Sequence, residues 1–171
     1  MSCKRLKVPL LLTTFTLAAA LCLPGFEVAE ATTTTSSFSV TMTITASCTI
    51  SSAGTLTFPS TGVLTSAVTA TSAIVVQCTN TTPYNIGLNA GTTTGGTTTT
   101  RLMANGATTI QYQMFTNSGH TTNWGNTVGT DTVSATGNGT NQSYTVYGQV
   151  PVQTSVAPAT YSDTVTVTVT Y

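Results

Sequence analysis

Few residues of this 171-residue chain have side chains that could do acid, base or metal chemistry. The whole sequence holds one His and four acidic residues. His120 lies in a polar stretch without a second metal ligand beside it, and Asp131 and Asp163 would have to meet in space to act as a glycosidase pair. Proton-transfer catalysis needs groups that titrate near the working pH. We therefore predict no enzymatic activity, no metal site and no cofactor.

Two further side chains indicate what the protein does not bind. Arg101 is the only basic residue after position 7, and a groove for nucleic acid cannot be built from one Arg. Trp124, between Asn123 and Gly125, would stack on sugar rings if it were exposed. The interpretation we favour is that it packs in the core.

The N-terminus has the pattern of a secretory signal peptide. Lys4, Arg5 and Lys7 precede an apolar run from Val8 to Leu23, and Ala29-Glu30-Ala31 supplies a small-x-small cleavage sequence. We predict a signal peptide over residues 1–31, with cleavage after Ala31. The protein is then exported.

Two other interpretations of the first segment fit less well. A transmembrane helix would need about 20 apolar residues, and the run is interrupted by Thr13, Thr14, Thr16 and Pro24. A lipid anchor on Cys22 would normally follow a small residue, whereas Leu21 precedes it. Cys22 therefore belongs to the signal peptide.

Two cysteines remain in the mature chain, Cys48 and Cys78. In an exported protein a pair of cysteines predicts one disulfide. Closing a loop of this length restricts the unfolded chain, which stabilises the fold by about 3.5 to 4 kcal/mol.

Strand-forming residues dominate the mature chain, and no segment has the spacing of an amphipathic helix. The sequence predicts an antiparallel all-β domain with turns rich in Gly, Asn and Ser, including a two-residue hairpin turn at Asn105-Gly106. The expected internal strands are 55–58, 73–79, 84–89, 101–104, 109–116 and 144–152. Several short strands with one disulfide favour an immunoglobulin-like sandwich.

The clearest alternation lies at the two ends of the mature chain. The run Phe38–Ala46 places apolar side chains on one face and Ser or Thr on the other, and the run Asp163–Tyr171 has the same period. Neither run has the internal charges or prolines that usually protect an edge strand. The first run can pair within its own domain or reach into another one.

The order of these segments resembles the spore coat protein U domain family, which forms subunits of archaic chaperone-usher pili. The resemblance spans the mature chain and rests on Ile44-Thr-Ala-Ser-Cys48, Gly54-Thr-Leu-Thr-Phe58, Ile74-Val-Val-Gln-Cys78 and Tyr161-Ser-Asp163-Thr-Val165-Thr-Val-Thr-Val-Thr-Tyr171.

The resemblance implies an incomplete immunoglobulin-like antiparallel β-sandwich, completed by a donor strand from a neighbouring subunit. A periplasmic chaperone fills the gap first, and the next subunit replaces it at an outer-membrane usher. The expected partners are therefore the chaperone, the usher, and identical or related pilus subunits in a polymer at the cell surface that supports adhesion and biofilm formation. The implied donor side chains are Phe38, Val40, Met42, Ile44 and Ala46, and the implied acceptor groove is Val165, Val167, Val169 and Tyr171.

The expected organisation is a signal peptide at 1–31, a linker and donor strand at 32–47, and a pilin sandwich at 48–171. Two alternatives stay open at this point. One is a secreted, non-polymerising binding module whose first strand pairs within its own domain. The other is a coat or matrix protein that uses the same fold without a pilus.

Overall fold

The computed structural model describes residues 30–171. Apart from Glu30 and Ala31, the predicted signal peptide lies outside the described residues. The chain divides into two units, Met1–Thr41 and Met42–Tyr171, and each is described by itself. Of the first unit, residues 30–41 are described, and they form no strand.

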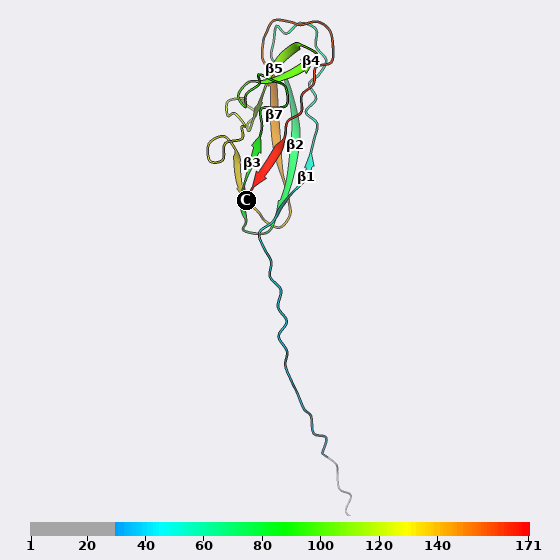
Figure 1. The fold of residues 1–171 in the computed structure, drawn as a ribbon, viewed down its shortest axis with the longest axis vertical. Helices are drawn as coiled ribbons and strands as arrows, with labels where there is room; N and C mark the ends of the chain where they lie inside the picture. Colours follow the sequence, from blue (N-terminus) through cyan, green and yellow to red (C-terminus); the bar gives the residue numbers. More distant parts are fainter. Residues whose placement is uncertain (1–29) are drawn as a thin grey trace, which may run out of the picture. The chain divides into compact units, whose positions relative to one another are not determined.

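The second unit is an antiparallel β-sandwich of two sheets (Figure 1). The larger sheet has the strand order β1-β2-β7-β5-β4 and the smaller has the order β6-β3-β8. Within residues 30–171 there is no helix long and apolar enough to cross a membrane. The strands are β1 (Cys48–Ala53), β2 (Val68–Cys78), β3 (Pro83–Leu88), β4 (Arg101–Asn105), β5 (Thr108–Phe115), β6 (Val133–Thr136), β7 (Asn141–Val150) and β8 (Val167–Thr170). The predicted all-β sandwich is confirmed.

The longest ladder joins β2 to β7 through ten residue pairs, from Val68 opposite Val150 to Gln77 opposite Asn141. Along both strands every second side chain turns inward, as a two-residue period requires. Ile74 and Val76 of β2 and Val146 of β7 are buried.

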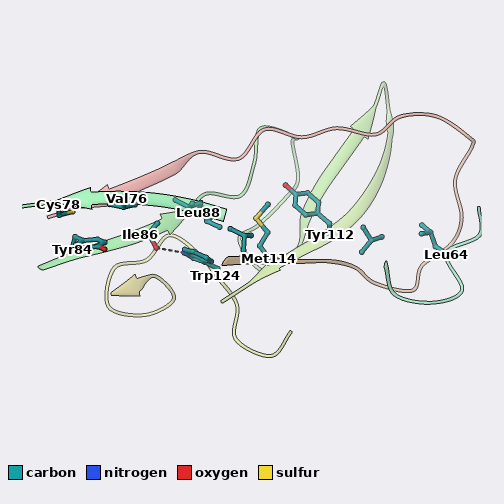
Figure 2. Packing of buried hydrophobic residues seen from close by; sticks show 12 residues of the cluster. Leu64, Val76, Cys78, Tyr84, Ile86, Leu88, Tyr112, Met114 and Trp124 are labelled. Atoms are coloured by element: carbon teal, nitrogen blue, oxygen red, sulfur yellow. Dashed lines mark hydrogen bonds between the residues drawn. The ribbon is translucent and has the colours of Figure 1, made fainter. Parts of the chain in front are cut away.

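The core lies between the two sheets (Figure 2). Its most deeply buried apolar side chains include Val76, Tyr84, Ile86 and Leu88, none more than 1% exposed. Trp124 is also buried, and its indole Nε1 donates a 2.8 Å hydrogen bond to the Ile86 carbonyl, drawn as a dashed line in Figure 2. The prediction that Trp124 packs in the core is confirmed, so it offers no exposed ring face for stacking.

Two segments with strand-like sequences form no strand among the described residues. Residues 38–46 lie in no strand, although their alternation is clear. A strand needs a neighbour for its backbone hydrogen bonds, and alternation alone does not supply one. Residues 55–58 are irregular because Leu56 and Phe58 fold inward over Gly148, where a Cβ would collide with both side chains.

Two strands were not predicted, and one turn is shifted. β1 is mostly exposed and polar, and β6 has only four residues, so neither has a strong apolar period. The β4–β5 hairpin pairs Asn105 with Thr108, which makes Gly106 and Ala107 the turn residues instead of Asn105-Gly106. Gly106 has φ of +57°, a backbone conformation that favours glycine.

The last predicted strand is shorter than expected. Only Val167–Thr170 is paired, with β3, although the alternation begins at Asp163. Asp163 instead binds a loop, as described below.

Candidate functional site: the gap between β1 and β8

Two strands at the same side of the sandwich have one uncovered edge each. β1 is the outer strand of the large sheet and β8 is the outer strand of the small sheet. They approach each other, β8 being the red arrow in Figure 1, but among the described residues no hydrogen-bonded ladder joins them. An uncovered edge presents unpaired backbone N–H and C=O groups. We call the space between these strands the β1–β8 gap.

The predicted acceptor residues lie along this gap. Val165, Val167 and Val169 are half-buried and pack against the core, while the alternating Thr side chains of the same segment are exposed. Tyr171 is 59% exposed. Three of the four predicted residues therefore present apolar surface that the domain itself covers only partly.

The predicted donor side chains lie outside the strands and are exposed. Phe38, Val40, Met42 and Ile44 are between 76% and 87% exposed, and Ala46 is also exposed. Large apolar side chains that are exposed at a two-residue period are unusual in a soluble protein. They indicate a surface that binds another protein, a membrane or a ligand. Their role as donors stays a prediction.

A cavity of about 380 Å³ lies at the end of the chain. Its lining includes Ile44 and Ala46, Pro83 at the start of β3, and the C-terminal Tyr171. One predicted acceptor residue and two predicted donor residues thus face the same opening within one chain.

Cys48 and Cys78 form a disulfide that joins the start of β1 to the end of β2. The two cysteines are direct partners in the β1–β2 ladder. Because β1 borders the gap and has a strand on one side only, this covalent link fixes the position of the gap's first wall.

The segment that leads into β8 is held by hydrogen bonds to Asp163. The Asp163 carboxylate accepts hydrogen bonds from the backbone N–H groups of Thr92 and Thr93 and from their hydroxyls, at 2.9 to 3.2 Å. Its other oxygen accepts a 2.7 Å hydrogen bond from the Tyr112 hydroxyl. Gly91, with φ of +87°, leaves the space that the carboxylate fills.

The electrostatics of this contact follow from its geometry. Burial alone would raise the pKa of Asp163, but the hydrogen bonds from Tyr112 and from the backbone of Thr92, Thr164 and Thr93 outweigh it, so the pKa lies below its ordinary value. Burial, followed by the hydrogen bond to Asp163, raises the pKa of Tyr112. Asp163 is therefore a charged anchor and not a general acid.

The only cation among residues 32–171 is fully buried. Arg101 is 0% exposed, and burial lowers its pKa. Its guanidinium donates four hydrogen bonds of 2.7 to 2.9 Å to backbone carbonyl oxygens, those of Leu88, Asn89, Thr98 and Trp124. Sequence reasoning missed this role, although a lone Arg between a polar loop and a strand is a usable signal.

The remaining candidate chemistry has a structural explanation. His120 stacks edge-on against Phe115 and Tyr147, with ring centroids 5.4 and 6.4 Å away. Asp131 accepts a 2.7 Å hydrogen bond from the backbone of Thr127. Among the described residues no three metal-ligating side chains come together.

The fold and the gap together define a β-sandwich with one open side and an unpaired apolar segment. Residues 34–168 match the Spore Coat Protein U domain, so the chain belongs to this family. No curated protein matches the sequence. Among solved structures, the chain is similar to a chain of the complex between the CsuC chaperone and the CsuE tip adhesion subunit, a pre-assembly complex of archaic chaperone-usher Csu pili of Acinetobacter baumannii.

That likeness has a TM-score of 0.55 at 28% sequence identity. The match covers 75% of this chain and 40% of the other, so this chain spans less than half of the protein it resembles.

Proposed function

We propose that this protein is a structural subunit of an archaic chaperone-usher pilus and assembles by donor-strand exchange. The observation that supports this most directly is the pair of complementary features in one chain. The β1–β8 gap leaves three Val side chains half-covered, and the segment 38–46 exposes apolar side chains at the same two-residue period. One extended strand in the gap would hydrogen-bond to an open edge and cover the Val row.

The energy available is sufficient for a stable link. Fully burying a large apolar side chain contributes about 1.5 to 3 kcal/mol. Phe38, Val40, Met42 and Ile44 would together contribute about 6 to 12 kcal/mol before the cost of ordering the segment. Such head-to-tail contacts do not close on themselves, so they build a filament.

The family and the structural neighbour support the choice of partners. The neighbour is a chaperone-subunit complex of a pilus. We propose that a periplasmic chaperone occupies the gap before assembly, that an outer-membrane usher exchanges it for the next subunit, and that the fibre at the cell surface serves adhesion and biofilm formation. This role needs no catalytic residues, and the family is one of structural subunits.

The proposed organisation keeps the boundaries expected from the sequence. Residues 1–31 direct export, 32–47 supply the linker and donor strand, and 48–171 form the acceptor domain. Val165, Val167, Val169 and Tyr171 are the proposed acceptor wall.

The test compares substitutions on the two faces of the donor segment. Chains carrying Ile44→Asp or Thr43→Asp are expressed with the chaperone and usher, and fibres are counted by electron microscopy. We expect Ile44→Asp to abolish fibres because a charge would enter an apolar groove, and Thr43→Asp to retain them because this side chain points the other way. Equal polymerisation of both variants would refute the donor assignment.

A deletion separates chaperone binding from polymerisation. Without residues 32–46 the domain should still copurify with the chaperone, since the gap is intact, but should form no fibres. Fibres from the deleted chain would overturn the proposal.

A further inference from the structure

The predicted acceptor wall is supported in two different ways along its length. Val167–Thr170 is paired with β3 through a regular ladder. Val165 lies before that ladder, in a stretch that belongs to no strand, yet it packs against the core as Val167 and Val169 do. Contacts outside the ladder therefore hold Val165 in line with the other two.

Asn89, the residue that follows β3, supplies the nearest of these contacts. Its backbone N–H donates a 3.1 Å hydrogen bond to the Thr166 carbonyl, as the next pair of an antiparallel ladder would. The return bond is different, because the Thr166 N–H donates to the side-chain Oδ1 of Asn89 at 2.9 Å. The side chain of Asn89 thus takes the place of a backbone acceptor.

The Asn89 carbonyl has another partner, since it accepts a 2.8 Å hydrogen bond from Arg101 Nε. The Oδ1 atom that bonds Thr166 also accepts a 3.0 Å hydrogen bond from the backbone N–H of Gly91, which is a local turn contact typical of Asn. One side chain therefore both ends the β3–β8 ladder and starts the loop that follows β3.

The loop that Asn89 starts reaches the other end of the same stretch. Its backbone N–H groups at positions 92 and 93 donate to the Asp163 carboxylate. Val165 is thus flanked by two residues, Asp163 and Thr166, that are both hydrogen-bonded to this loop and its start. The position of Val165 depends on side chains, whereas the rest of the wall depends on the ladder.

The register of the ladder directs the main chain of the Val row to the gap. In an antiparallel pair, the N–H and C=O groups of successive residues bond to opposite sides. Because Thr166 bonds on the β3 side, the main-chain groups of Val165, Val167 and Val169 are directed to the β1–β8 gap. A strand in the gap would hydrogen-bond to the same three residues whose side chains it covers.

We propose that Asn89 is a positioning residue for donor-strand binding: it keeps Val165 in the acceptor wall and so sets the length of edge that a donor can use. This inference rests on the proposed assembly by donor-strand exchange. Without the Oδ1 acceptor, the Thr166 N–H loses its partner and the first part of the wall is free to move, while Val167–Thr170 keeps its ladder.

The first test follows the wall without a donor. It uses the full exported chain, residues 32–171, carrying Ile44→Asp so that it stays monomeric, and measures amide hydrogen exchange by NMR. We expect Asn89→Leu to speed exchange of the Thr166 amide about fivefold, the loss of one hydrogen bond, and to leave the Thr168 amide unchanged. Asn89→Asp keeps the acceptor oxygen and should retain the protection.

The second test measures how the donor uses Val165. A peptide of residues 37–46 is titrated into the same chain by calorimetry. Val165→Ala and Val169→Ala should each weaken binding about fivefold, since each removes methyl groups that the donor would cover. In the Asn89→Leu background, Val165→Ala should have no further effect and Val169→Ala should keep its full effect. A general loss of stability would not distinguish the two positions.

Asn126→Leu is the matched control, because Asn126 is exposed and lies between β5 and β6. It should change neither Thr166 exchange nor peptide binding. Unchanged Thr166 exchange in Asn89→Leu, or an undiminished effect of Val165→Ala in that background, would overturn the role of Asn89 and leave donor-strand exchange standing. No peptide binding by the monomeric parent chain would overturn donor-strand exchange, and the role of Asn89 with it.

Discussion

At the scale of single residues, Arg101 links segments that are distant in sequence. Its four hydrogen bonds end on carbonyls of β3, of the loops at 89 and 98, and of Trp124. Arg101→Met should lower the free energy of unfolding by at least about 3 kcal/mol, because it leaves buried carbonyl oxygens without donors. Urea unfolding measures the loss, and Arg101→Lys, with fewer donors, should recover only part of it. A loss below about 1 kcal/mol would contradict this role.

Because of Asp163, the free energy of unfolding should depend on pH in the acid range. Its folded pKa is depressed, so the stabilisation is present above the unfolded pKa of about 4 and is lost as the pH falls through the folded pKa. Asp163→Asn removes the charge at every pH. We expect the two proteins to differ in melting temperature at pH 7 and to converge as the pH falls below about 4. A difference that stays constant between pH 7 and pH 2 would show that Asp163 acts through packing alone.

At the scale of elements, β8 has one face toward the core and one toward solvent. Val167 is half-buried and Thr168 is exposed. Val167→Asp should prevent chaperone binding and fibre formation, because it places a charge on the acceptor wall, whereas Thr168→Asp should permit both. Copurification with the chaperone measures the effect. Loss of chaperone binding in both variants would contradict the prediction. It would mean that a charge on either face of β8 prevents chaperone binding.

The disulfide should stabilise the pairing of β1 with β2 in particular. Replacing both cysteines with Ala removes a link that closes a loop of 30 residues, which should cost about 3.5 to 4 kcal/mol. Chemical unfolding of oxidised protein and of the double variant gives the difference. Indistinguishable unfolding midpoints would mean that the β1–β2 ladder holds without the covalent bond.

At the scale of the whole molecule, the open gap predicts that the isolated domain is folded but less stable than the domain with a strand in the gap. A peptide spanning residues 37–46, added to the chain lacking 32–46, should raise its melting temperature by several degrees, since a ligand that binds only the folded state stabilises it by RT ln(1 + [L]/Kd). The same peptide with Asp at position 44 should not. A stable monomer that is indifferent to the peptide would instead favour the secreted binding module.

Much of this architecture could be predicted because strand alternation is local. The inward faces of β2, β7 and β8 are visible as a two-residue period of Val, Ile and Tyr, and the scarcity of ionisable side chains is visible in the composition. The pairing of Cys48 with Cys78 needed only a count and the inference of export.

Other features were invisible because they depend on which segments meet. β1 and β6 have little apolar period and become strands only because longer strands lie beside them. Arg101 is buried, and Asp163 is hydrogen-bonded to Thr92 and Thr93, only because segments that are distant in sequence come together in the fold.

By itself the sequence determined the strand periodicity, the single disulfide and the unusual polar surface, since each follows from residue types and their local spacing. Only the tertiary structure decided where the sandwich is open. Pairing partners are chosen by long-range packing, and the same alternation describes a strand with a neighbour, such as β8, and the segment 38–46, which has none within the described chain.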